Sequence, residues 1–266
     1  MDLQLSGKTA LVTGGSMGIG KAVARALADE GVDVAILART KATLQAAADE
    51  LEGATGRRIL AVPADTSRDD SVRDAARQVA EAFGHIDILV NCAAQPAGQG
   101  PAPTLAEVTD EAFFGDVNTK VMGYLRCIQA VAPHMKRQGW GRIINISGMA
   151  ARTPASIIGS IRNVSVVAMT KNVAEQLGPF GINVTVVHPG MTRTEKTAAL
   201  ARAQAEQSGS SVEEAEKRRF GGNLLGRAID ASDIAAVVTF LASPRSVAIN
   251  GDVIAAAGGT RGSIHY

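Results

Sequence analysis

An eight-residue run near the start of the chain, Thr13-Gly14-Gly15-Ser16-Met17-Gly18-Ile19-Gly20, has the residue types and spacing that suit phosphate binding. It follows an apolar strand pattern and leads directly into a helical one. Gly14 permits a tight turn, Gly18 lets backbone N–H groups face a pyrophosphate, and Gly20 lets the helix pack closely on the strand. We therefore expect a nucleotide-binding turn; the alternative is an ordinary glycine-rich turn. Its candidate contacts are Thr13, Gly14, Ser16, Met17, Gly18, Ile19 and Gly20.

The pattern that follows the turn indicates the fold that positions it. Ile19, Val23 and Leu27 recur at helical spacing, and strand-like runs then alternate with helical patterns along the chain. This alternation predicts an α/β fold, a Rossmann-type doubly wound parallel sheet of about seven strands with helices on both faces. The expected strands are Thr9–Val12, Val32–Ala38, Ile59–Val62, Ile86–Asn91, Arg142–Ser147, Ile182–His188 and Asp252–Ala256. Without a linker or repeat, residues 1–266 are interpreted as one domain.

Small and polar residues follow the expected strand ends, where open α/β sheets bind ligands. They include Asp65, Thr66, Asn91, Ala93, Ser147, Pro189 and Gly190. After the fourth strand, Thr104, Thr109 and Asp110 are N-cap candidates for one long helical stretch that leads to Met135. Residues 195–223 interrupt the alternation beside the same edge, which favours a mobile substrate lid over a solvated helical excursion.

Composition excludes several other classes of function. The formal net charge is +1, from 27 basic and 26 acidic residues, which gives no electrostatic reason to expect nucleic acid or an anionic membrane as partner. No apolar run approaches the length of a membrane span, and the N-terminal residues lack the apolar core of a signal peptide, so we expect a cytoplasmic protein. Cys92 and Cys127 are interpreted as reduced core residues. His85, His134, His188 and His265 show no ligand spacing, and no metal is expected.

Taken together, these motifs resemble the short-chain dehydrogenase/reductase family over nearly the whole chain. Besides the glycine turn, the resemblance rests on Asp65, Asn91-Cys92-Ala93-Ala94, the strand Gly141 to Ser147, Ala168-Met169-Thr170-Lys171, Pro189-Gly190-Met191-Thr192-Arg193-Thr194 and Gly258-Gly259. It implies that the turn holds a pyrophosphate, Asp65 meets adenine, and Asn91 braces the central strand. Thr192 and Thr194, with Pro189 and Gly190, would border the nicotinamide amide. The family also implies a small-molecule substrate and a homodimer or homotetramer.

The end of the second strand indicates which dinucleotide binds. An acidic residue there would bond the ribose 2′-hydroxyl and repel a 2′-phosphate, but this chain has Ala38 followed by Arg39 and Thr40. A guanidinium beside a hydroxyl favours NADP(H), because arginine matches phosphate with paired hydrogen bonds. The alternative is that Arg39 is merely exposed at a strand end.

The catalytic positions depart from the family pattern. The family uses a Tyr-x-x-x-Lys pair, and anchoring on Ala168 to Lys171 places these at Gly159 and Asn163. The catalytic serine falls at Gly148, one residue after Ser147, and the asparagine of the preceding helix falls at Lys120. Lysine and asparagine therefore exchange places. A shift of one or two residues in the short segment 148–159 would bring Ser160 to the tyrosine position.

Lys120, Ser147, Ser160 and Asn163 are thus the candidate catalytic residues. A desolvated Lys120 with a lowered pKa could act as an acid or as an electrostatic clamp, or it could only hold the ribose, and Asn163 could take over a ribose contact. Tyr124, one helical turn after Lys120, is expected to pack between helices. The sequence supports an NADP(H)-dependent oxidoreductase with an atypical proton-transfer site, acting on a small carbonyl, imine or enone. The alternative is an inactive NADP(H)-binding sensor or scaffold.

Overall fold

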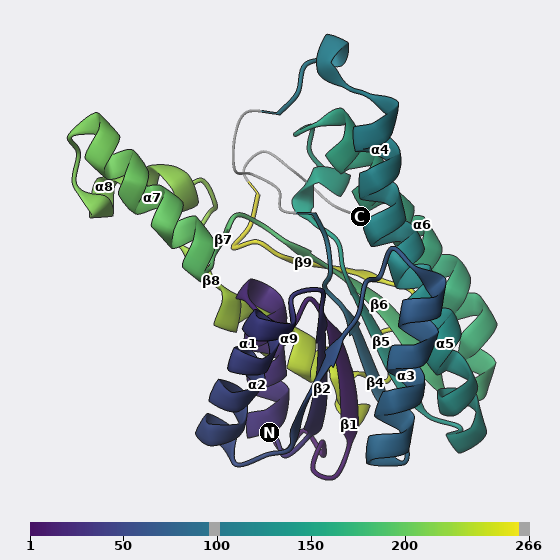
Figure 1. Ribbon diagram of the computed structural model, residues 1–266. Helices are drawn as coiled ribbons and strands as arrows, with labels where there is room; N and C mark the ends of the chain where they lie inside the picture. Colours follow the sequence, from purple (N-terminus) through teal and green to yellow (C-terminus); the bar gives the residue numbers. More distant parts are fainter. Residues whose placement is uncertain (96–101, 261–266) are drawn as a thin grey trace.

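The computed structural model describes residues 1–95 and 102–260, so His265 and the second tyrosine, Tyr266, lie outside the described part of the chain. The main sheet is entirely parallel, with seven strands in the order β3-β2-β1-β4-β5-β6-β9 (Figure 1). Its strands are β1 Thr9–Thr13, β2 Asp33–Ala38, β3 Ile59–Pro63, β4 Ile88–Asn91, β5 Gly141–Ile146, β6 Ile182–Pro189 and β9 Val253–Ala256. The predicted Rossmann-type fold and its seven strands are confirmed.

The strand order places a ligand site at the centre of the sheet. From β1 the chain builds outward to β2 and β3, and then returns to place β4 on the other side of β1. Loops on the two sides of this reversal diverge to opposite faces, which leaves a crevice at the carboxyl ends of β1 and β4. The glycine turn leaves β1 at this crevice, and Cys92 and Ala93 follow β4 there.

Two layers of helices bury the sheet (Figure 1). One face packs against α1 Gly18–Asp29, α2 Lys41–Thr55 and α9 Ala231–Ala242, through side chains such as Val23, Leu44 and Val238. The other face packs against α3 Asp69–Phe83, α5 Gly123–Gln138 and α6 Ile157–Leu177, through side chains such as Val79 and Val131. Burial on both faces explains why the strands are continuous apolar runs instead of alternating ones.

The predicted helical stretch that leads to Met135 is present, and it contains an irregular turn that the sequence pattern did not predict. A 3₁₀ turn, Leu105–Glu107, precedes α4 Asp110–Val117; a π-helical turn, Asn118–Met122, then joins α4 to α5. The Thr109 hydroxyl accepts a hydrogen bond from the Ala112 amide and so caps α4, as expected from the sequence. Lys120 lies inside the π turn.

The segment 195–223 forms two packed helices, α7 Glu195–Ser208 and α8 Val212–Phe220, which stand out from the body beside the carboxyl ends of the strands (Figure 1). A two-stranded sheet, β7 Thr192–Arg193 with β8 Ile229–Asp230, lies at their base. Arg193 donates two hydrogen bonds to Asp230 and one, at 3.0 Å, to Glu216 of α8. In the described ranges, no helix combines the length and apolar character that crossing a membrane requires.

Candidate active site

The glycine turn is held in a shape that only glycine permits at two positions. Gly14 and Gly18 have φ angles of 67° and 57°, and the Gly14 amide donates to the Leu37 carbonyl oxygen at 2.7 Å. A Cβ on Gly20 would lie 2.2 Å from the Gly14 carbonyl oxygen, so the first turn of α1 packs directly on the strand exit. The positive end of α1 therefore points into the crevice with bare backbone around it.

An anionic oxygen already sits at this helix end. The Gly18 amide donates to Oε2 of Glu195, the first residue of α7, at 3.1 Å. Thr194 lies beside the same glycine, because its Cγ2 is 3.5 Å from where a Gly18 Cβ would be. The contact demonstrates that the Gly18 N–H can bind an anionic oxygen, which is the chemistry that a pyrophosphate needs.

Charged residues meet at the ends of β2 and β3. Arg39 and Thr40 are exposed after β2, and Asp65 follows β3. Burial raises the pKa of Asp65, but hydrogen bonds from the Ser67 hydroxyl and amide, together with the charges of Arg39 and Arg68, outweigh it and lower that pKa below its usual value. Arg39 is therefore close enough to act on Asp65, and both are placed around one rim of the crevice.

Thr13 and Asn91 use their side chains to build the crevice. The Thr13 hydroxyl accepts hydrogen bonds from the amides of Cys92 and Ala93 at 2.9 and 3.0 Å, which fixes the loop after β4 beside the glycine turn. Asn91 donates to Oδ1 of Asn145 on β5 at 2.9 Å, and Asn145 donates in turn to the Thr170 hydroxyl of α6. These contacts tie the central strands to α6 below the site.

Lys120, Ser147 and Asn163 form one buried hydrogen-bonded cluster. The Lys120 ammonium donates to the Ser147 carbonyl oxygen at 3.0 Å and to Oδ1 of Asn163 at 3.1 Å. The Ser147 hydroxyl donates to the Asn163 carbonyl oxygen at 3.0 Å, and Lys120 is 3% exposed. Three of the four predicted catalytic residues are thus brought together, with a cation at their centre.

The π turn explains how a lysine reaches this position from the α4–α5 side. Arg126 donates to both the carbonyl oxygen and Oδ1 of Asn118, which satisfies backbone oxygen that the irregular turn exposes. The Thr66 hydroxyl donates to the Thr119 carbonyl oxygen at 3.2 Å, and Asn118 donates to the Ser67 carbonyl oxygen. The loop after β3 therefore holds the turn and directs Lys120 at the end of β5.

Burial changes the acidity of Lys120. Its pKa is lowered from 10.5 to about 7, mainly by removal from water and then by the nearby charge of Arg162, against smaller opposing effects of Cys92 and Asp116. Burial raises the pKa of the Cys92 thiol to about 12, so this neighbour stays protonated at neutral pH. Lys120 is therefore a group whose proton can be gained and lost near neutrality.

Neighbouring side chains closely approach Gly148 and Gly159, the two glycines that the sequence pattern aligns with the family's serine and tyrosine. A Cβ on Gly148 would lie 3.0 Å from Nδ2 of Asn163. A Cβ on Gly159 would lie 2.5 Å from the Ser156 hydroxyl, which accepts the Gly159 amide and caps α6. The Gly148 amide donates to Nδ1 of His188 at 3.3 Å. Both glycines are therefore enclosed by neighbouring polar side chains.

Neither remaining hydroxyl joins the cluster. Ser160 is half-buried on α6, and none of the hydrogen bonds of the described cluster involves its side chain. Tyr124 is fully buried, and its hydroxyl donates to the Ile146 carbonyl oxygen at 2.9 Å, so it packs in the core as expected.

The loop after β6 approaches the crevice through another close contact. A Cβ on Gly190 would lie 2.9 Å from Cβ of Ala257, so glycine lets this loop lie against the end of β9. The Thr192 hydroxyl donates to the Gly190 carbonyl oxygen, and the Thr194 hydroxyl caps α7. Pro189 ends β6 immediately before this loop.

Sequence reasoning missed two charged features of the site. Arg162 donates to both carboxylate oxygens of Asp116 at 2.8 and 2.7 Å in a largely buried ion pair between α6 and α4. The Glu195 carboxylate accepts a hydrogen bond from the Gly18 amide. The signals were present: Arg162 stands in the same short run as Gly159 and Asn163, and Glu195 directly follows Thr194.

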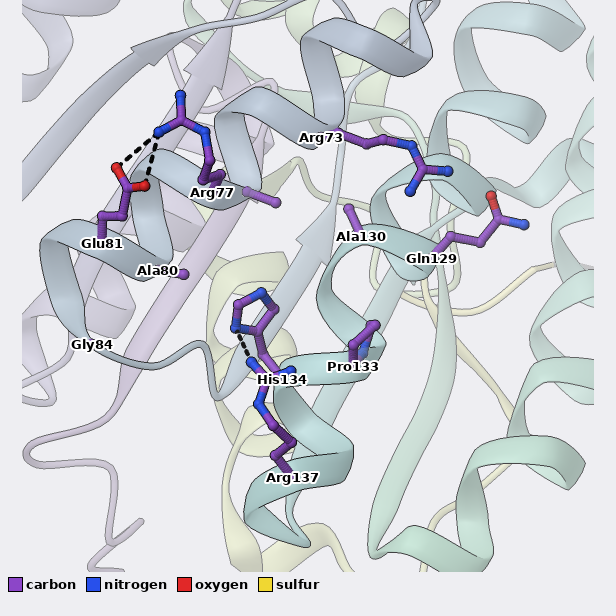
Figure 2. Close-up of a pocket in the computed structure, with 11 residues that line it drawn as sticks. Arg73, Arg77, Ala80, Glu81, Gly84, Gln129, Ala130, Pro133, His134 and Arg137 are labelled. Atoms are coloured by element: carbon purple, nitrogen blue, oxygen red, sulfur yellow. Dashed lines mark hydrogen bonds and ion pairs between the residues drawn. The ribbon is translucent and has the colours of Figure 1, made fainter.

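Among residues 1–95 and 102–260, some hollows lie away from this cluster. One, of about 560 Å³, adjoins the Gly18–Glu195 contact between α1 and α7. Another, of about 500 Å³, lies between α3 and α5, where Figure 2 shows Arg77 paired with Glu81 and Arg137 against His134. Its lining includes Gly84, just past the end of α3, so it lies toward the amino-terminal edge of the sheet, away from Lys120. The paired charges there do not converge on the crevice.

Comparisons with known proteins identify the family. Residues 8–205 match the family model described as short chain dehydrogenase. The chain belongs to the short-chain dehydrogenase family.

Similar short-chain dehydrogenases cover nearly all of the chain. The short-chain reductase protein NovJ of Streptomyces niveus is 34% identical over 94% of this chain and 92% of its own length. The 3-oxoacyl-[acyl-carrier-protein] reductase FabG of Staphylococcus epidermidis is 33% identical over 95% of this chain and 98% of its own. The structure of L-sorbose reductase from Gluconobacter frateurii, complexed with NADPH and L-sorbose, has a TM-score of 0.91 at 27% identity, over 99% of this chain and 100% of that one.

Proposed function

We propose that this short-chain dehydrogenase is an NADP(H)-dependent oxidoreductase that reduces a small carbonyl, imine or enone, with Lys120 in place of the family's tyrosine as proton donor. The observation that carries the proposal is the buried Lys120 ammonium, held between Ser147 and Asn163 at the carboxyl edge of the sheet. A buried cation of this kind is costly unless it has a task or a partner of opposite charge.

The residues of the crevice fit a dinucleotide. The Gly18 amide binds an anionic oxygen, and the close approach of Gly20 to Gly14 leaves bare backbone for a pyrophosphate. Arg39 and Thr40 offer a guanidinium and a hydroxyl to a 2′-phosphate, and the similar L-sorbose reductase binds NADPH. When bound, the nicotinamide supplies the hydride.

Lys120 suits the proton transfer that must accompany hydride addition. A general acid works best when its pKa lies near the working pH, and the pKa of Lys120 is lowered to about 7. As a cation it would also stabilise negative charge that develops on the substrate oxygen or nitrogen. Asn163 orients the ammonium through Oδ1. The Ser147 hydroxyl holds Asn163 in place by donating to the Asn163 carbonyl oxygen.

Two further parts of the molecule support this function. Helices α7 and α8 stand beside the crevice and would cover a bound substrate, with Glu195 and Arg193 at their base. Ile157, Ile161 and Val164 are exposed on α6 at helical spacing, which supports assembly into a dimer or tetramer through this helix.

Turnover and binding by matched variants test the proposal. We expect the chain to bind NADPH and to oxidise it with some member of a panel of small ketones, cyclic imines and enones. Lys120→Met should keep NADPH affinity but lower kcat by about 10² to 10⁴, the usual contribution of a general acid. Lys171→Met, which removes an exposed lysine of α6, is the control. Full activity of Lys120→Met would remove the role assigned to this lysine, and tight NADPH binding without any turnover would leave a cofactor-binding protein.

A further inference from the structure

Arg162 is a buried cation with an incomplete set of partners. It is 7% exposed, and Nη1 donates to both carboxylate oxygens of Asp116. Nε of Arg162 is buried and has no hydrogen-bond partner among the described residues. Within the same residues, the hydrogen bonds that this guanidinium donates all come from Nη1. The edge formed by Nε and Nη2, the edge that pairs best with a carboxylate, is therefore left over.

The guanidinium lies where the family's tyrosine would begin. Nη2 of Arg162 is 3.8 Å from the point where a Cβ on Gly159 would be. Side chains of a helix lean toward its N-terminus, so an arginine three residues after Gly159 covers that position. On this face of α6, the guanidinium of Arg162 therefore lies near the position where the family resemblance places a tyrosine side chain.

The charges around the site do not balance without a ligand. Arg162 and Lys120 are both buried, and the charge of Arg162 is felt at Lys120, whose pKa it lowers. Asp116 is the acidic partner of Arg162, and Lys120 is held by two uncharged oxygens. A buried, unsatisfied N–H, together with an excess of positive charge among the described side chains whenever Lys120 is protonated, is expected where a ligand completes the site.

We propose that Arg162 binds a carboxylate of the substrate, so that the site takes small anionic oxo or imino acids in which the reacting C=O or C=N bond lies next to that carboxylate. The proposal rests on the proposed function. Arg162 would anchor the carboxylate through Nη2, the nitrogen that lies toward the Gly159 position, and Lys120 would face the neighbouring oxygen or nitrogen. A neutral ketone would leave the arginine edge unpaired, which is the usual basis for rejecting such an analogue.

Binding of two small probes tests this assignment. Oxamate carries a carboxylate beside an amide carbonyl, and oxamide is its neutral counterpart; each is titrated by calorimetry into the full chain saturated with NADPH. We expect oxamate to bind about ten-fold or more tightly than oxamide, as a hydrogen bond to a charged group implies. Arg162→Gln should reduce that preference to about one, Arg162→Lys should retain part of it, and Arg73→Gln, an exposed arginine of α3, should retain all of it.

A double variant covers the risk that Arg162→Gln leaves a buried, unpaired carboxylate. Arg162→Gln with Asp116→Asn replaces the ion pair by two amides, and its fold is checked by thermal melting and NADPH affinity. An unchanged preference for oxamate in this variant, or equal affinity of both probes in the unaltered chain, overturns the proposal. Failure of the unaltered chain to bind NADPH contradicts the proposed function instead, and the probe comparison is then made without cofactor.

Discussion

The ammonium of Lys120 lies 3.1 Å from Oδ1 of Asn163, across the space between the π turn and α6. The family resemblance places asparagine at position 120 and lysine at position 163, so the two residue types are exchanged and still meet. The cation is delivered from the opposite helix, and the α6 side keeps a neutral amide. On the same helix, Nη2 of Arg162 lies 3.8 Å from where a Cβ on Gly159 would be.

Activity should depend on pH through Lys120. A proton donor must be protonated, and burial lowers the pKa of Lys120 to about 7. We expect kcat/KM for reduction to be constant below about pH 7 and to fall up to tenfold per pH unit above it. Initial rates between pH 5.5 and 9, with NADPH affinity measured in parallel, check this. A flat profile through pH 9 would assign the proton to another group.

Stability should rise with pH in the alkaline range. The pKa of Lys120 is about 7 in the folded chain and 10.5 as its ordinary value, so between these values the unfolded chain binds more protons. The free energy of unfolding should therefore increase by up to about 1.4 kcal/mol per pH unit from this residue. Urea unfolding of the unaltered chain and of Lys120→Met between pH 7 and 10 isolates the effect as a difference. Parallel curves would contradict it.

Gly148→Ser should damage the site without restoring the family's serine chemistry. Its Cβ would lie 3.0 Å from Nδ2 of Asn163, so the amide must shift and Lys120 loses an acceptor. We expect kcat to fall about tenfold and the midpoint of the pH profile to move lower, because the lost acceptor favoured the charged lysine. Gly53→Ala, a helical position with open space, is the control. Unchanged kinetics in Gly148→Ser would show that Asn163 does not orient Lys120.

Arg39→Asp should change the preferred dinucleotide. An aspartate at the end of β2 would repel a 2′-phosphate and accept a hydrogen bond from a 2′-hydroxyl. We expect the ratio of NADPH to NADH affinity to fall about 100-fold, from the loss of a charged hydrogen bond and the gain of repulsion. Fluorescence titrations with both cofactors measure the ratio. Arg137→Asp on α5 should leave it unaltered, and the same ratio in both variants would remove Arg39 from the cofactor site.

Glu195→Gln should bind NADP(H) more tightly. The Glu195 carboxylate accepts the hydrogen bond of the Gly18 amide, so a pyrophosphate that binds there must displace this negative charge from the N-terminal end of α1. Removing that charge should raise affinity about three- to tenfold, mostly through faster association, and Glu206→Gln on the same helix should have no effect. Stopped-flow binding of NADPH measures the association rate, and titration measures the affinity. Weaker binding in Glu195→Gln would mean that the carboxylate assists the bound cofactor.

The sheet could be predicted closely because its signal is local and repeated. Buried parallel strands are continuous apolar runs, and Ile182–His188 and Thr9–Val12 were each found within one residue of their ends. The helical stretch through Met135 is present, but the π turn at Asn118–Met122 within it could not be predicted, because a π turn has no sequence periodicity of its own and is stabilised by tertiary partners such as Arg126 and Thr66.

The candidate site could be predicted in part. Lys120, Ser147 and Asn163 converge as a set. Lys120 and Asn163 stand at positions that the family motif marks, and Ser147 directly precedes a third such position, Gly148. Ser160 does not join them, because α6 begins at Ile157 and its cap hydroxyl, Ser156, fixes the phase of the helix. Arg162 was passed over because burial of a charge depends on a partner, Asp116, that is 46 residues away in the chain.

A turn of π-helix spans one residue more than a turn of α-helix, so Asn118–Met122 accommodates one residue that an uninterrupted helix would lack. Deleting one residue there would restore ordinary helical pairing and leave α4 and α5 in the same rotational phase. The packing of both helices would survive, but position 120 would no longer face the end of β5. The presence of this cation in the crevice therefore depends on one inserted residue in a helix whose two flanking segments are otherwise regular.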